Sequence, residues 1–80
     1  MRPDRITELL EANNHEVERR RAVVHAARKL RNTLAASADV LECFANEVPS
    51  PRCAERARVC ADAIRQQIEE ARMAVPELRL

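Results

Sequence analysis

Apolar residues recur at helical spacing along most of the chain. Between residues 23 and 48 they alternate in steps of four and three, which is the heptad pattern of a helix that packs along one stripe: Val23, Ala27, Leu30, Leu34, Ser37, Leu41, Phe44 and Val48. A similar stripe follows after a short interruption: Cys53, Ala57, Cys60, Ile64, Ile68, Ala71 and Val75. These two stripes predict two helices that pack against each other.

Three prolines set the limits of the two helices. Pro49 disfavours helical dihedral angles at Val48, so the first helix is expected to end near that residue. Ser50 followed by Pro51 is typical of an N-cap residue and the first position of a new helix. The second helix is therefore expected to run from about Pro51 to the residue before Pro76.

Folding the chain back at Pro49 and Pro51 gives an antiparallel hairpin. The heptad stripe of the first helix then begins where the second helix ends, and this agreement between independent features is the main argument for the hairpin. The same pairing places Arg28 and Arg31 near acidic residues of the second helix, Glu69 and Glu70. It also predicts contacts between two groups of stripe residues: Leu34, Leu41 and Phe44 against Ala57, Cys60 and Ile64.

Residues 1–22 carry an apolar stripe for which the hairpin offers no partner. Its members are Ile6, Leu10 and Val17, with Leu9 beside them. The polar run Asn13-Asn14-His15 interrupts this stripe, and asparagine is a poor residue for a helix interior. A break or kink at Asn13–Asn14 is therefore the favoured interpretation, and a continuous helix is the alternative.

The composition supports an all-α fold. The chain of 80 residues has no glycine and one aromatic residue, Phe44, whereas sheets and their turns favour aromatic and β-branched residues and glycine. We therefore expect one helical domain over residues 1–80: an N-terminal helical extension or short third helix (1–22), a long antiparallel helical hairpin (23–75) and a tail (76–80). Because so short a hairpin buries little surface, it is expected to dimerise into a helical bundle.

Arginine is concentrated just after the leading segment. Arg19, Arg20 and Arg21 are consecutive, and residues 19–31 contain no acidic residue, which would suit a nucleic-acid-binding regulator. The net charge of the whole chain is only +1, and this stretch has no aromatic side chain on which a base could stack. Nucleic-acid binding is thus the alternative, and contact with another protein or a second copy is the leading interpretation.

The cysteines and histidines do not form a pattern that indicates catalysis or metal binding. Zinc sites need four ligands, usually with closely spaced cysteine pairs, and Cys53 and Cys60 are seven residues apart. We expect these two cysteines to be buried in the stripe and Cys43, which is off the stripe, to be exposed. The chain has no glycine-rich loop for a phosphate and no converging catalytic side chains. No enzyme activity, metal, cofactor or small-molecule substrate is therefore expected.

Neither a membrane span nor a secretory signal is expected. The sequence has no run of about 20 apolar residues, and its first residues lack the apolar segment of a signal peptide. A cytoplasmic location is therefore the expectation.

The overall plan of a short leading helix before a helical hairpin resembles that of small type III secretion co-chaperones. It is also similar to hairpin regulators that dimerise into four-helix bundles. The likeness concerns architecture and involves no shared sequence motif. Because the hairpin is expected to associate, the leading interpretation is a small protein–protein interaction module, such as an adaptor, a co-chaperone or an anti-activator, and a purely structural subunit is a further alternative. The residues expected to bind the partner are those of the leading segment and its basic end: Ile6, Leu9, Leu10, Val17, Arg19, Arg20 and Arg21.

Overall fold

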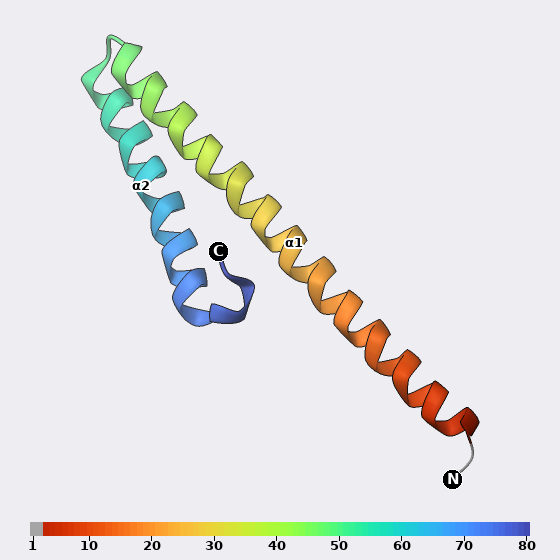
Figure 1. Ribbon diagram of the computed structural model, residues 1–80. Helices are drawn as coiled ribbons and strands as arrows, with labels where there is room; N and C mark the ends of the chain where they lie inside the picture. Colours follow the sequence, from red (N-terminus) through yellow and green to blue (C-terminus); the bar gives the residue numbers. More distant parts are fainter. Residues whose placement is uncertain (1–2) are drawn as a thin grey trace.

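A computed structural model describes residues 3–80, and it is helical throughout apart from the turn and the C-terminal end. Helix α1 spans Pro3–Glu47, helix α2 spans Pro51–Ala74, and a short 3₁₀ helix, η1, spans Pro76–Leu78. The two long helices lie side by side and antiparallel, and the first extends far beyond the end of the second (Figure 1). The molecule is a rod with dimensions of 74 × 19 × 12 Å. The prediction of an all-α helical hairpin is confirmed.

The turn between the helices forms where the prolines predicted it. Helix α1 ends at Glu47, and the Val48 amide still donates to the Phe44 carbonyl at 2.9 Å. Ser50 has extended backbone angles (φ −82°, ψ 116°), and its hydroxyl accepts a hydrogen bond from the Cys53 amide at 3.4 Å. This is the arrangement of an N-cap residue, which satisfies one of the free amides at the start of a helix. The predicted cap and helix ends are therefore confirmed.

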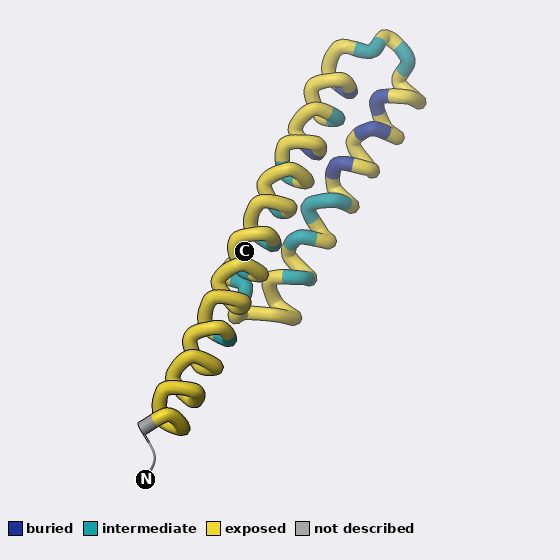
Figure 2. The backbone as a smooth tube through the Cα atoms, turned by 90° about the vertical axis from the view of Figure 1, so that its right-hand side faces the viewer, coloured by how far each residue is buried: buried dark blue, intermediate teal, exposed yellow. Residues whose placement is uncertain are grey.

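Alanine fills the contact between the two helices. The five buried residues in the described chain are all alanines: Ala38, Ala45, Ala54, Ala57 and Ala61. Figure 2 shows that the buried positions lie on the inner sides of α1 and α2, mostly in the half nearer the turn. Larger residues such as Leu41, Val48 and Ile64 are half-buried at the margins of this contact. A small side chain allows two helices to approach closely, so the alanines form a narrow core.

Only part of each predicted heptad stripe lies in the helix contact: Leu41, Ala57 and Ile64 are buried or half-buried, whereas other stripe positions are replaced there by the residue that follows them. Phe44 is 51% exposed and Leu30 60% exposed, while Ala45, next to Phe44, is buried. In α2, likewise, Cys53 and Cys60 are exposed and Ala54 and Ala61 are buried. The prediction that Phe44 and Cys60 lie in the helix contact is therefore wrong, whereas Leu41, Ala57 and Ile64 are buried or half-buried as predicted. One residue corresponds to about 100° around a helix, so Leu30, Phe44 and Cys60 lie beside the contact instead of in it.

Helix α1 is nearly twice as long as α2. Its 45 residues span about 68 Å and the 24 residues of α2 about 36 Å at the usual helical rise. The N-terminal half of α1 consequently projects beyond the hairpin as a single helix; we call residues 3–22 the arm. The helix runs unbroken through Asn13 and Asn14, so the favoured prediction of a break there is wrong and the continuous alternative is correct.

The C-terminal residues fold back toward α1 instead of trailing away as a tail. Arg79 has left-handed backbone angles (φ 52°, ψ 49°), and its amide donates to the Pro76 carbonyl at 3.1 Å. The Arg28 guanidinium of α1 donates to the Arg79 carbonyl at 3.1 Å, and Arg72 donates to the Leu80 carbonyl at the same distance. These contacts place η1 and the last residues near the base of the arm.

Candidate interaction surfaces

The arm exposes the apolar residues that the sequence had singled out. Leu9 and Leu10 are 65% and 60% exposed, and Ile6 and Val17 are also exposed. Ile6, Leu10 and Val17 share one side of α1 because they are separated by four and seven residues. No helix of the described chain faces this side of the arm beyond its base.

Neither long helix in residues 3–80 is apolar enough over its length to cross a membrane.

The three consecutive arginines are divided between two environments. Arg19 and Arg20 both form ion pairs with Glu16, one turn earlier on α1. The hydrogen bond and charge of Arg19, together with those of Arg20, lower the pKa of the Glu16 carboxyl from its usual value. Arg20 and Arg21 both line an open depression near the C-terminal segment. Much of the charge of Arg19 and Arg20 is thus balanced within the helix itself.

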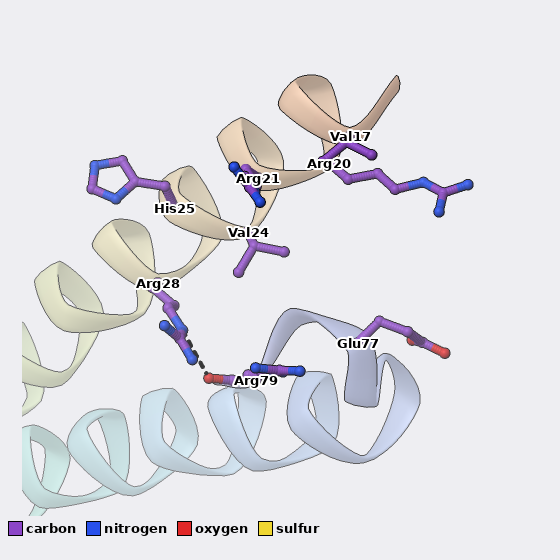
Figure 3. Close-up of a pocket in the computed structure, with 8 residues that line it drawn as sticks. All are labelled: Val17, Arg20, Arg21, Val24, His25, Arg28, Glu77 and Arg79. Carbon is purple, nitrogen blue, oxygen red and sulfur yellow. Dashed lines mark hydrogen bonds between the residues drawn. The ribbon is translucent and has the colours of Figure 1, made fainter. Parts of the chain in front are cut away.

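The depression at the base of the arm is strongly basic. Figure 3 shows Arg20, Arg21, His25 and Arg28 projecting from α1, with Arg79 and Glu77 contributed by the C-terminal segment. A neighbouring depression shares His25, Arg28 and Arg79 and adds Lys29 and Arg31. We call these residues the basic surface. The sequence predicted its α1 half, but the contribution of Arg79 depends on the folded-back C-terminal segment and was missed.

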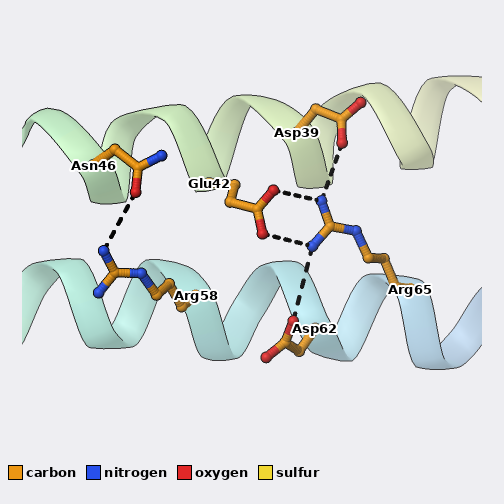
Figure 4. A network of polar contacts seen from close by, with 6 residues as sticks. All are labelled: Asp39, Glu42, Asn46, Arg58, Asp62 and Arg65. Atoms are coloured by element: carbon orange, nitrogen blue, oxygen red, sulfur yellow. Dashed lines mark hydrogen bonds and ion pairs between the residues drawn. The ribbon is translucent and has the colours of Figure 1, made fainter.

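One face of the hairpin is polar, and Arg65 joins the two helices there through hydrogen bonds and ion pairs. Its guanidinium donates two parallel hydrogen bonds to the Glu42 carboxylate, both at 3.1 Å, and one to Asp39 at 3.0 Å (Figure 4). Asp62 lies 3.8 Å from the same group, and Arg58 donates to the Asn46 side chain at 3.4 Å. The hydrogen bonds and charge of Arg65 hold the pKa of the Glu42 carboxyl below its usual value.

This arrangement of charges differs from the predicted one. Arg28 donates to the Arg79 carbonyl and Arg31 to the neighbouring Asn32 side chain, so neither forms the predicted ion pair with Glu69 or Glu70. Among the ion pairs of the described residues, those that join α1 to α2 all involve Arg65. The sequence offered no sign that this arginine would be the shared partner.

The opposite face of the hairpin is apolar. Phe44 follows Glu42 by two residues, and Cys60 follows Arg58 by two, so each lies about 200° around its helix from the polar contacts. We call this side the apolar face; its exposed residues are Leu30, Leu34, Ser37, Val40 and Phe44 of α1 and Cys53, Cys60, Ala63 and the polar Gln67 of α2. The exposed members of the two heptad stripes thus lie on the same side of the hairpin, one set on each helix.

All three cysteines are exposed. The prediction for Cys43 is confirmed, and the prediction that Cys53 and Cys60 are buried is wrong because both belong to the apolar face. Within residues 3–80 the structure forms no group of three or more His, Cys, Asp or Glu side chains that could hold a metal ion.

Comparisons with protein families, characterised proteins and solved structures found no match to this chain.

Proposed function

We propose that the chain is a small protein–protein interaction module, of the adaptor, co-chaperone or anti-activator type, that binds another protein through the arm. The observation that supports this proposal is the exposed stripe of Ile6, Leu10 and Val17 on the part of α1 that extends beyond α2, with Val17 at its base near the C-terminal segment. Such a stripe suits a partner with an apolar groove, because helices bound in grooves use anchors one and two turns apart. Burial of these side chains would provide most of the affinity.

The proposal is tested by co-purification from native host cells with quantitative mass spectrometry. Replacing Leu10 and Val17 with Asp should remove the bound partner, because a buried carboxylate without a counter-charge opposes association. The matched control replaces His15 and Ala22 with Asp; these residues are also seven apart, but they lie on the opposite side of the helix. The control should retain the partner. If both variants retain it, or if both lose it while remaining helical, the arm stripe is not the binding surface.

A second candidate function is nucleic-acid binding by the basic surface. It is favoured by the way that the C-terminal segment adds Arg79 to the α1 residues Arg21, His25 and Arg28. Nuclease treatment during the same purification distinguishes the two functions, and so does the salt dependence of binding. Replacing Arg19, Arg20 and Arg21 with Gln should affect a protein partner less than the Leu10/Val17 variant does. The opposite ranking would support nucleic acid and contradict the leading proposal.

A further inference from the structure

We propose that the apolar face is a dimer interface, on which a second copy of the chain packs face to face with its hairpin running in the opposite direction. The product is a four-helix bundle from which two arms project at opposite ends. This inference concerns a different surface from the arm and holds whether or not the arm binds a partner.

The accessible area of the chain supports association. A compact monomer of 9.1 kDa would expose about 4900 Å² by the usual scaling with mass, whereas this chain exposes 6841 Å². The difference, roughly 1900 Å², reflects an elongated molecule whose larger apolar side chains remain in water. Part of it belongs to the arm, and the rest belongs to the sides of the hairpin.

The dimensions of the apolar face fit a stable dimer. The face is as long as α2, about 36 Å, and at most as wide as the 19 Å breadth of the molecule, so its footprint is no more than about 700 Å². Stable protein interfaces bury about 800 Å² on each partner. The polar face is less suited to this role because Arg65, Asp39 and Glu42 already satisfy one another there.

The apolar face is complementary to itself. Leu30 and Phe44 lie seven residues on either side of Ser37, which corresponds to two helical turns in each direction. A two-fold axis that crosses the hairpin at Ser37 therefore places Leu30 of one copy against Phe44 of the other. The Ser37 hydroxyl can be buried at this centre because it already donates to the Thr33 carbonyl at 2.9 Å.

The charges at the margin of the face obey the same symmetry. Arg56 and Glu70 of α2 are both exposed and lie on one side of the helix, fourteen residues apart, with Ala63 midway between them. Ala63 and Ser37 are at about the same level of the hairpin, since the buried residues Ala61 and Ala38 are two positions and one position away on their helices. The two-fold axis thus brings Arg56 of each copy to Glu70 of the other.

Sedimentation equilibrium of the full chain at micromolar concentrations tests the proposal. The wild-type chain should approach twice its monomer mass of 9.1 kDa. A variant with Leu30→Asp and Phe44→Asp should dissociate at least about 100-fold more readily, because each copy would bury two unpaired carboxylates in the interface. The matched control, Val59→Asp with Met73→Asp, changes exposed apolar residues on the outer side of α2 and should remain a dimer.

A charge exchange tests the antiparallel arrangement without placing charge inside the face. Arg56→Glu alone should weaken dimerisation about tenfold, and adding Glu70→Arg should restore it. A wild-type chain that stays monomeric, a Leu30/Phe44 variant that stays dimeric, or a double exchange that does not recover would each overturn the proposal. So would loss of the dimer in the Leu10/Val17 arm variant, because that result would assign self-association to the arm.

Discussion

Alanine side chains determine how α1 and α2 meet. Ala38 and Ala61 have no exposed surface, and each contributes only a methyl group to the contact. Alanine loses no side-chain entropy when it is ordered and has the highest helix propensity, so a contact made of alanines favours both helix formation and close approach. The hydrophobic gain from five methyl groups is small, however. The hairpin contact therefore specifies the register of the helices but leaves the larger apolar residues available for other contacts.

Enlarging a buried alanine should destabilise the hairpin. Replacing Ala38 with Leu adds three carbon atoms where no space exists, and we expect the free energy of unfolding to fall by about 1–3 kcal/mol. Ala36→Leu is the matched control, because Ala36 is exposed on the same helix and its change should stay within about 0.5 kcal/mol. Urea denaturation followed by circular dichroism measures both. Equal effects of the two substitutions would contradict the described contact.

The partly displaced stripe shows what a heptad pattern can and cannot establish. Leucine and phenylalanine recur at heptad spacing in α1, and alanines recur at the same spacing one residue later, at Ala38 and Ala45. An interpretation weighted by hydrophobicity selects the larger residues. The competing signal was present in the second helix as well, where Ala54 and Ala61 are also seven apart. Only the requirement that the helices approach closely distinguishes the two stripes, and it becomes visible in the packing.

At the scale of the elements, the turn was predictable because its chemistry is local. Pro49, Ser50 and Pro51 act on their own backbone angles and amides, so their effect does not depend on distant contacts. Whether α1 continues through Asn13 and Asn14 depends instead on the difference between two free-energy costs. An asparagine costs up to about 0.7 kcal/mol in a helix interior, whereas a break would forfeit several helical hydrogen bonds and require new caps. The unbroken helix through Asn13 and Asn14 reflects that difference.

The two halves of α1 should differ in local stability. The second half of α1 runs beside α2 (Figure 1), whereas the arm relies on its own hydrogen bonds and side-chain pairs such as Glu16 with Arg20. Isolated helices of that length are marginal in water. Amide hydrogen exchange, measured by NMR on the monomer, should therefore be much faster at residues 6–14 than at residues 38–45. Equal protection in the two segments would show that the arm is covered by something that the described chain does not provide.

At the scale of the whole molecule, the hairpin separates three surfaces. The arm carries an apolar stripe. Arg65 pairs with acidic residues across the polar face, and the apolar face lies on the other side of the hairpin. The exposure of the arm residues was predictable from the sequence, because these apolar positions lack a partner in the hairpin; association itself stays a prediction. The sequence did not predict which face would be open. Which face is open depends on the side of each helix that the buried alanines occupy. It also depends on the ion pairs of Arg65, which lie on the opposite face.

The native cysteines provide the most direct test of this account. Cys53 and Cys60 lie on the apolar face, whereas Cys43 points away from it, so modification by a thiol reagent reports on the face without any substitution. In solutions too dilute for the proposed dimer to form, we expect all three thiols to react rapidly. As concentration increases, Cys53 and Cys60 should become protected while Cys43 does not change. Protection of Cys53 and Cys60 in the dilute monomer would place them in the helix contact and contradict the account, as would equal reactivity of all three thiols at every concentration.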